Sequence, residues 1–262
     1  MVTLAITGAA GRMGQRLIAV AKESKDLSIT AAIERGDSPW LERDAGEVAG
    51  IGPIGVPITS DLRSTPDVLI DFTVPSAMRH WLKACRDSGI AMVIGTTGLQ
   101  QADHDAIDIA AQHIPILQAG NMSLGVTVMC KVVAEVARLL GDDYDVEVVE
   151  AHHRYKKDAP SGTAEMIADS ILTALNRTKE NLVYGRHGAD VTRKPKDVGM
   201  HSIRIGDEVG LHTAYFAALG ERLEITHKAT NRDTFVHGAH KAARWLARQT
   251  PGRYTIQQML GM

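Results

Sequence analysis

The sequence contains few cysteines, almost no net charge and no long apolar run, and each shortage excludes a class of protein. Cys85 and Cys130 are the two cysteines, and neither CxxC spacing nor a disulfide framework surrounds them, so we expect buried thiols in a reducing compartment. A formal net charge of -2 supplies no global positive field for a nucleic-acid backbone. Because no stretch is apolar enough to span a membrane and the N-terminus lacks a secretory pattern, we expect a cytoplasmic protein with no nucleic-acid or membrane partner.

The remaining composition is that of an ordinary globular chain. Apolar residues make up 44% of the sequence and charged residues 23%, with 24 glycines, which is unlike a disordered or fibrous protein. The 262 residues suit either one large α/β unit or two modest domains, and we favour two.

The first half alternates β-rich apolar runs with helical segments, which predicts a parallel sheet covered by helices. We expect strands at 2–7, 27–33, 68–73, 91–94 and 115–119. After Gly11 the apolar residues recur at helical spacing, so the loop between the first strand and its helix contains the glycines. This arrangement is typical of a Rossmann-like domain.

The character of the chain changes after Asn121. Apolar residues line one face of the next predicted helix, at Met129, Val132, Val133, Val136 and Leu140, which could lead into a second domain. Beyond it, β-rich runs at 145–150, 202–205, 212–217 and 222–227 predict an antiparallel or mixed sheet. We expect a long loop at 184–200, with a solvated surface around Arg193, Lys194 and Lys196. Periodicity alone cannot place a final helix at about 233–248.

The strongest local signal is the run from Gly8 to Gly14, GAAGRMG, which follows the first strand directly. Glycines let the backbone turn sharply and approach a pyrophosphate, and the N-terminus of the next helix stabilises its charge. The GxxGxxG spacing is less common than GxGxxG, and a simple tight turn is the alternative. The strand and helix on either side favour a dinucleotide site.

Three later segments support this interpretation. Glu34 ends the second strand, where a carboxylate can accept hydrogen bonds from the ribose of NAD, and Arg35 could pair with the 2′-phosphate of NADP. A surface acid–base pair is the alternative. Gly95, Thr96 and Thr97 follow one later strand, and 119–122 follows another, at the edge where open α/β sheets bind ligands.

A second informative stretch is EAHHRYKKDAPSGTA, from Glu150 to Ala164. It leaves a strand with concentrated positive charge and enters a helix through Pro-Ser-Gly-Thr, so basic side chains adjoin a helix N-terminus. Both parts favour an anion, and His and Lys can exchange protons, which suits a small carboxylate substrate. The alternative is an exposed basic loop in which Ser161 or Thr163 is only a helix cap.

Metal and serine-hydrolase chemistry are disfavoured. No HExxH, CxxC or GxSxG motif occurs, so we expect no metal site. The histidines that could gather in space are better explained by acid–base and anion chemistry, or as structural groups; they are His152, His153, His201, His212 and His227.

Together these segments resemble the 4-hydroxy-tetrahydrodipicolinate reductase family, formerly called dihydrodipicolinate reductases. GAAGRMG, Glu34-Arg35, IDFT, VIGTTG, Gly120-Asn121, EAHHRYKKDAPSGTA and GERLEITHKA occur in order along nearly the whole chain. The resemblance implies an α/β fold with a Rossmann-like parallel-sheet dinucleotide-binding domain and a second α+β domain with a mixed sheet. It implies that the last segment returns to the first domain, so we expect domains of 1–123 plus 233–262 and of 124–232. It also implies a homotetramer assembled through the second domain.

The implied activity is the reduction of 4-hydroxy-tetrahydrodipicolinate, a small cyclic dicarboxylate, to tetrahydrodipicolinate with loss of water. This step belongs to lysine and diaminopimelate biosynthesis and uses NAD(H) or NADP(H). By resemblance, His152 donates or accepts a proton and Lys156 donates one, while His153, Lys156, Gly162 and Thr163 bind substrate. The residues implied to line the cofactor site are Gly8, Ala9, Ala10, Gly11, Arg12, Met13, Glu34, Arg35, Gly95, Thr96, Thr97, Ala119, Gly120, Asn121 and Met122.

Two positions depart from the family pattern. Val74 stands where some members carry an arginine that helps to bind the NADP phosphate, which weakens any preference for NADP. Met122 stands where some relatives have phenylalanine, which keeps apolar packing but loses aromatic stacking. We therefore expect use of either cofactor, without ranking them.

Two other functions remain open from the sequence. A dinucleotide-sensing regulator without turnover would use the first domain alone, but no DNA-binding helix pair is evident and His152 and Lys156 argue for chemistry. A related dehydrogenase of an amino-acid semialdehyde or oxo acid would differ in substrate.

Overall fold

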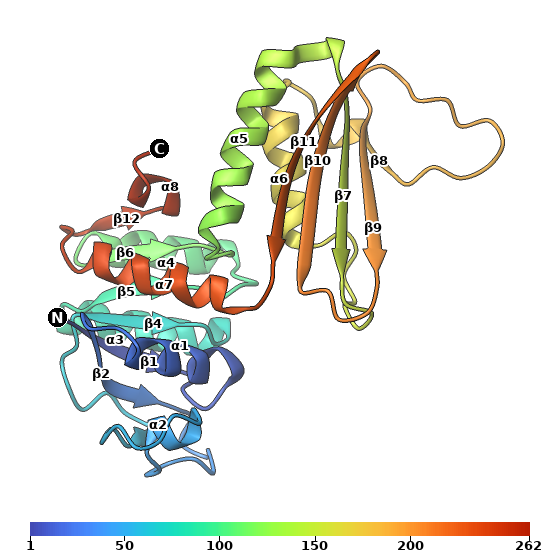
Figure 1. Ribbon diagram of the computed structural model, residues 1–262. Helices are drawn as coiled ribbons and strands as arrows, with labels where there is room; N and C mark the ends of the chain where they lie inside the picture. The colour runs from blue at the N-terminus through green and yellow to red at the C-terminus, as the bar shows by residue number, and fades with distance from the viewer. The chain divides into compact units, whose positions relative to one another are not determined.

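The computed structural model describes residues 1–262 and divides into two compact units (Figure 1). The first contains Met1–Ser123 and Asp233–Met262, and the second contains Leu124–Arg232. These bounds coincide with the domain limits expected from the sequence. The C-terminal segment therefore returns to the first unit, which periodicity alone could not establish.

A seven-stranded, fully parallel sheet forms the centre of the first unit. Its order is β12-β6-β5-β4-β1-β2-β3. The strands are β1 (Val2–Thr7), β2 (Leu27–Ile33), β3 (Ile58–Thr59), β4 (Val68–Asp71), β5 (Ala91–Ile94), β6 (Pro115–Gln118) and β12 (Gly252–Tyr254). The order reverses at β1, which lies between β4 and β2, and such a switch point is where doubly wound folds bind ligands.

Helices cover both faces of this sheet, so its central strands are buried throughout: β5 is wholly apolar, and β4 is apolar up to its last residue, Asp71. Helices α1 and α7 pack together on one face, and α3 and α4 on the other (Figure 1). The helices are α1 (Arg12–Lys22), α2 (Ala45–Val48), α3 (Pro75–Ser88), α4 (Gln101–Ala111), α7 (Asp233–Leu246) and α8 (Ile256–Met259).

The second unit contains a mixed five-stranded sheet, as the sequence predicted. Its order is β11-β10-β7-β9-β8; β10 runs antiparallel to β7 and β11, and β9 runs parallel to β7 and β8. The strands are β7 (Asp145–His152), β8 (Leu182–Tyr184), β9 (Val198–Arg204), β10 (Gly210–Ala218) and β11 (Glu221–Ala229). Strand β9 begins four residues earlier than the expected run at 202, and the expected strands at 68–73 and 115–119 each end earlier.

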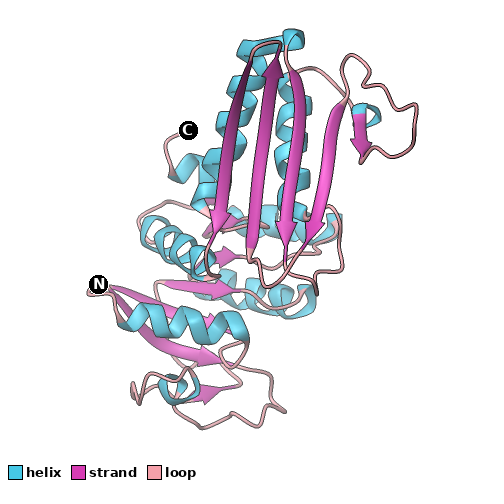
Figure 2. Ribbon diagram, turned by 45° about the vertical axis from the view of Figure 1, so that its right-hand side comes forward, coloured by secondary structure: helices cyan, strands magenta, loops and turns pink.

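Helices α5 (Leu124–Leu140) and α6 (Gly162–Ala174) cover one face of this sheet and leave the other open (Figure 2). The core between helices and sheet includes Val133, Ile167, Val148 and Phe216. Two short 3-10 helices, Gly141–Asp143 and Lys179–Asn181, complete the unit.

The loop between β8 and β9 corrects one expectation. Arg193 is not a solvated surface residue, because its side chain is 21% exposed and pairs with Asp145 and Glu147. Arg186 from the same loop donates to both carboxylate oxygens of Glu147, at 3.0 Å each. The loop is therefore tied to the open face of the sheet by charge-assisted hydrogen bonds.

No helix of the structure is both long enough and apolar enough to cross a membrane.

His240 of α7 gives the first unit a predicted sensitivity to acid. Its ring is buried, Nε2 has no hydrogen-bond partner, and burial, with the nearby charge of Arg244, lowers its pKa to about 4. The unfolded chain would take up this proton near its ordinary pKa of about 6.5. Keeping His240 neutral therefore costs no folding free energy above about pH 6.5. The free energy of unfolding falls as the pH drops from there toward 4.

NMR titration of the His240 ring, identified with a His240→Asn variant, should show a neutral imidazole until the pH approaches 4. Urea unfolding followed across the same range should show the falling stability. A titration midpoint near 6.5 in the folded protein would contradict the prediction.

Candidate active site

The glycine run forms a tight turn between β1 and α1. Gly8 has φ +62°, and Gly11 is the helix N-cap, with no side-chain hydrogen bond to the first turn. A Cβ added to Gly14 would overlap the Gly8 carbonyl oxygen and lie 2.7 Å from the Ala9 Cα. Only a residue without a side chain lets the loop close this tightly onto α1. The exposed Gly11 and Arg12 then flank a helix N-terminus that can receive phosphate.

Glu34 joins this turn to the end of β2. Its Oε1 accepts a hydrogen bond from the Ala10 amide at 3.0 Å. Arg35 is exposed and pairs with Asp37 at 3.0 Å, and both side chains are 75% exposed. A surface pair of this kind is weak, so the Arg35 guanidinium is free to turn toward a phosphate.

A buried carboxylate lies beneath the same edge of the sheet. Asp71, the last residue of β4, is fully buried and accepts hydrogen bonds from Thr7 at 2.6 Å, from Thr73 at 2.7 Å and from Thr96. The Thr96 hydroxyl also accepts from the Thr73 amide. These bonds tie the ends of β1, β4 and β5 together. The motif IDFT marked the family resemblance, but nothing in its local pattern indicated that the aspartate holds three strand ends together.

The other predicted cofactor residues follow β5 and β6. Gly95 packs so closely on Phe72 that an added Cβ would overlap the ring, whereas Thr97 is exposed. Ala119 donates to the Ile94 carbonyl, and the Asn121 side chain accepts from the Ser123 amide at 2.8 Å. The structure thus brings the four predicted segments to the carboxyl edge of one sheet. Ala9 and Ala10 lie in the glycine turn, Met13 lies in the first turn of α1, and Gly120 is exposed beside Asn121.

Met122 is placed differently from the others. Its side chain is buried, and its carbonyl lies where a Cβ on Gly238 of α7 would overlap it. The predicted apolar contact with a cofactor would require this side chain to become accessible. Val74 is exposed at the start of α3.

In the second unit, His152 ends β7 and is buried against a carboxylate. Its Nδ1 lies 2.6 Å from Oε2 of Glu150, which is fully buried. Arg204 of β9 donates to both oxygens of Glu150, at 2.9 and 2.8 Å. Burial acts to raise the pKa of Glu150, but the hydrogen bonds from Arg204 and His152 outweigh it and hold the pKa below its usual value.

A second buried histidine stands beside His152. The rings of His152 and His212 meet edge to face with centroids 5.1 Å apart. Burial, together with the neighbouring charge of His152, lowers the pKa of His212 to about 4, so this ring is neutral near pH 7. Its Nε2 lies 3.1 Å from the hydroxyl of Ser161. From the sequence, His212 was only one of several histidines that could gather in space, and no pattern predicted its contact with Ser161.

Ser161 also caps α6, as one reading of the sequence expected: its hydroxyl accepts from the Ala164 amide. Gly162 follows with open space around the position of a Cβ, so its amide at the helix N-terminus is accessible to an anion. Thr163 begins the same turn. The cap and the anion site are therefore compatible.

Lys156 and His153 lie in the segment between β7 and α6. The Lys156 ammonium donates to both oxygens of Asp158, at 2.9 and 2.8 Å, and this contact lowers the pKa of that carboxyl. Asp158 is largely exposed, so the pair is weak and Lys156 can turn to another anion. His153 has a buried Nδ1 without a partner, which leaves it a polar atom to offer a ligand.

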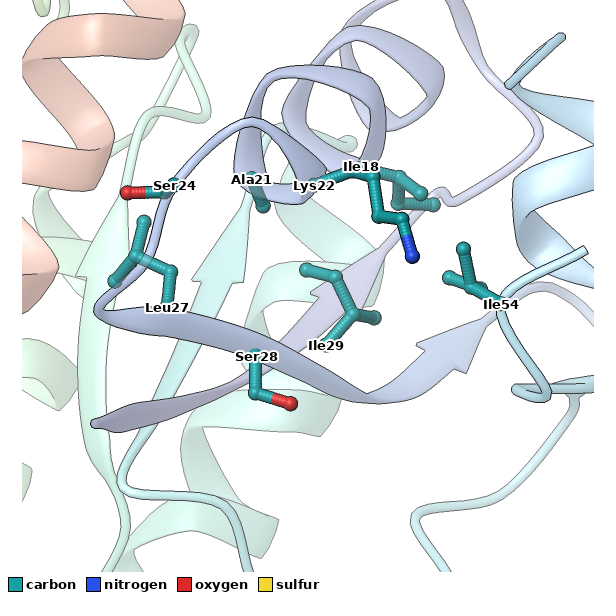
Figure 3. A pocket seen from close by; sticks show the side chains of 8 residues that line it. All are labelled: Ile18, Ala21, Lys22, Ser24, Leu27, Ser28, Ile29 and Ile54. Atoms are coloured by element: carbon teal, nitrogen blue, oxygen red, sulfur yellow. The ribbon is translucent and has the colours of Figure 1, made fainter. Parts of the chain in front are cut away.

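No group of three or more His, Cys, Asp and Glu side chains is arranged to hold a metal ion. A surface pocket of about 260 Å³ lies elsewhere in the first unit, between the second half of α1, the start of β2 and Ile54 (Figure 3). The dinucleotide segments all follow the carboxyl ends of strands, so this pocket is not part of the candidate site.

A glycine turn at the switch point of a doubly wound sheet, together with a second unit that presents histidine, lysine and a helix N-terminus, defines a class: two-domain, dinucleotide-dependent oxidoreductases. The chain matches the family model for the N-terminus of dihydrodipicolinate reductase over residues 2–122 and the model for its C-terminus over residues 125–260. The protein belongs to the dihydrodipicolinate reductase family.

Individual relatives agree with the family models. Two curated proteins named 4-hydroxy-tetrahydrodipicolinate reductase cover essentially the whole chain. The one from Syntrophotalea carbinolica is 47% identical over 100% of both chains, and the one from Alkalilimnicola ehrlichii is 48% identical over 99% of this chain and 98% of its own.

Solved structures show the same fold. A dipicolinate-bound dihydrodipicolinate reductase from Paenisporosarcina sp. TG-14 has a TM-score of 0.78 at 24% identity, covering 97% of each chain. An amine dehydrogenase from Mycobacterium smegmatis has a TM-score of 0.59 at 13% identity, covering 97% of this chain and 95% of its own.

We predict that Gly14→Ala weakens dinucleotide binding about 5- to 150-fold, because relieving an overlap with the Gly8 carbonyl costs about 1–3 kcal/mol and must move the loop. Titration calorimetry with NADH and NADPH measures the loss. Gly11→Ala is the graded control, since its Cβ would lie 3.1 Å from the same oxygen and should weaken binding less. Equal binding by wild type and Gly14→Ala would show that the turn does not contact the cofactor.

Proposed function

We propose that this protein reduces 4-hydroxy-tetrahydrodipicolinate to tetrahydrodipicolinate with loss of water, using NADH or NADPH, in lysine and diaminopimelate biosynthesis. The observation that carries the proposal is the full-length match to the reductase family. The buried His152–Glu150 pair beside an anion-ready helix N-terminus supplies the chemistry that such a reaction needs. We also propose that the protein acts in the cytoplasm, because both of its cysteines are free thiols, as is usual in a reducing compartment.

The residues of the first unit fit a nicotinamide dinucleotide. The glycine turn leaves no side chain between its backbone and a pyrophosphate, and the first amides of α1 can donate to it. Glu34 would accept from a ribose hydroxyl and Arg35 would meet a 2′-phosphate, so either cofactor is accommodated. When bound, the cofactor supplies the hydride that reduces the imine.

The residues of the second unit fit a small dicarboxylate. The Gly162 and Thr163 amides and His153 would hold a carboxylate, and Lys156 would exchange its pairing with Asp158 for the substrate. His152 would pass a proton through Nε2, the ring nitrogen that Glu150 does not bind. Neutral His212 would keep a second positive charge away from this ring.

We also propose a homotetramer assembled through the second unit. The face of its sheet left open by α5 and α6 carries Val149, Ile203 and Leu211, and Ile203 is 46% exposed. An apolar sheet face of this kind is suited to contact between subunits.

We predict rapid oxidation of NADH or NADPH when substrate is generated from pyruvate and aspartate semialdehyde by the preceding synthase. His152→Ala should lower kcat by about 10²- to 10⁴-fold, the usual contribution of a positioned acid or base, with cofactor binding intact. Absorbance of the reduced nicotinamide measures both rates. Normal turnover by His152→Ala would remove its proposed role, and no turnover by a wild-type protein that binds both ligands would favour a dinucleotide sensor.

We further predict that Arg35→Ala raises the KM for NADPH about tenfold or more, the size of a lost charge-assisted contact of 1.5–3 kcal/mol, while the KM for NADH changes little. Arg63→Ala is a control, because Arg63 is another exposed arginine with a weak acidic partner. Equal effects of Arg35→Ala on the two cofactors would show that this side chain does not meet the 2′-phosphate.

A further inference from the structure

The hydrogen bond between His152 and Glu150 distinguishes the two nitrogens of the imidazole. Glu150 stands two residues before His152 on the same strand, so both side chains lie on one face of the sheet. An ionised carboxylate can only accept hydrogen bonds, and the 2.6 Å contact therefore requires a proton on Nδ1. Nε2 is left to exchange a proton with a ligand.

The surroundings of Nε2 are kept open by a glycine. Gly210 begins β10, and a Cβ added there would lie 3.1 Å from Nε2 of His152. The absence of a side chain at this position leaves the nitrogen uncrowded on the side of the neighbouring strand.

Arg204 fixes the carboxylate in turn. It pairs with His152 in the register between β7 and β9, and its two terminal nitrogens hold the two oxygens of Glu150. Arg204 also donates to the Asp158 carbonyl at 2.6 Å, which ties the pair to the segment that contains Lys156. A carboxylate gripped at both oxygens cannot swing away from the imidazole.

We propose that Glu150, held by Arg204, is a positioning residue for proton transfer: it fixes His152 in the Nδ1–H tautomer and stabilises the imidazolium, so that Nε2 exchanges the proton. This inference rests on the proposed role of His152 and extends it to two residues that the resemblance did not implicate. The arrangement follows the logic by which a buried carboxylate orients a catalytic histidine in hydrolases.

Charged and titratable groups face His152 from each element packed against it. Glu150 is on the same strand, Arg204 is on β9, His212 is on β10 with His227 behind it on β11, and Lys156 and Asp158 are in the following loop. Burial lowers the pKa values of His212 and His227, so neither adds positive charge near pH 7. Glu150 is the negative group in direct contact with the ring, and its removal leaves a protonated imidazole facing Arg204.

The test compares Glu150→Gln with wild type in steady-state turnover across pH. Gln keeps the shape and an accepting oxygen but removes the charge. We expect kcat to fall about 10²-fold or more, with the KM for the imine little changed. The limb of the pH profile that His152→Ala abolishes should move to lower pH by about one unit or more, because the imidazolium has lost its counter-charge.

Glu147→Gln is a matched control. Glu147 lies on the same strand, faces the opposite side of the sheet, and is likewise bound by an arginine and a histidine, Arg186 and His201. It should leave the kcat and the pH profile unchanged. If Glu150→Gln keeps the pH profile of the wild type while His152→Ala is inactive, Glu150 does not position His152. The proposed function would still stand in that case.

A measurement on the wild-type protein covers the case in which Glu150→Gln does not fold. Long-range proton–nitrogen NMR correlations of His152, assigned with the His152→Ala variant, should show the neutral ring protonated at Nδ1. A neutral ring protonated at Nε2 would overturn the proposal. Full turnover by His152→Ala would instead remove the proposed function of this histidine, so the two failures are distinguishable.

Discussion

Each unit of this protein depends on a carboxylate that is buried at or near the carboxyl end of a strand. Such a group is costly unless it is surrounded by donors. In the first unit the hydroxyls of Thr7, Thr73 and Thr96 surround Asp71, and in the second Arg204 and His152 surround Glu150. Thr7, Thr96 and Arg204 belong to, or directly follow, neighbouring strands. Their hydrogen bonds to the carboxylates therefore also fix the ends of those strands. Those ends carry the candidate site.

Much of the fold could be predicted because its strands and glycines produce strong local patterns. The bounds of β1, β2 and β5 agree with the expected ones, since apolar runs between helices leave little ambiguity. The two-residue β3 and the three-residue β12 were missed, because so short a strand has no periodicity. Arg193 was misplaced for another reason: its partner Glu147 is 46 residues away, and no local pattern reveals such a pair.

The residues of the candidate site also differ in how well the sequence predicts them. The glycine turn, His152 and Lys156 could be found because their chemistry is contained in one contiguous segment. Asp71, Arg204 and the contact between His212 and Ser161 could not, since strand register rather than spacing brings these groups together. His152 meets Arg204 only because β7 and β9 pair in parallel. The residues that sequence reasoning missed are thus mostly those that support the functional side chains.

The two adjacent histidines show how such support separates chemical roles. His152 and His212 have rings 5.1 Å apart, yet Glu150 contacts only His152, whereas His212 is paired with a neutral hydroxyl. Burial, with the neighbouring charge of His152, lowers the pKa of His212 to about 4, so His212 is neutral near pH 7, whereas His152 has the carboxylate of Glu150 against its Nδ1. Two residues of the same type can thus have different roles in one site, because one histidine has a carboxylate partner and the other does not.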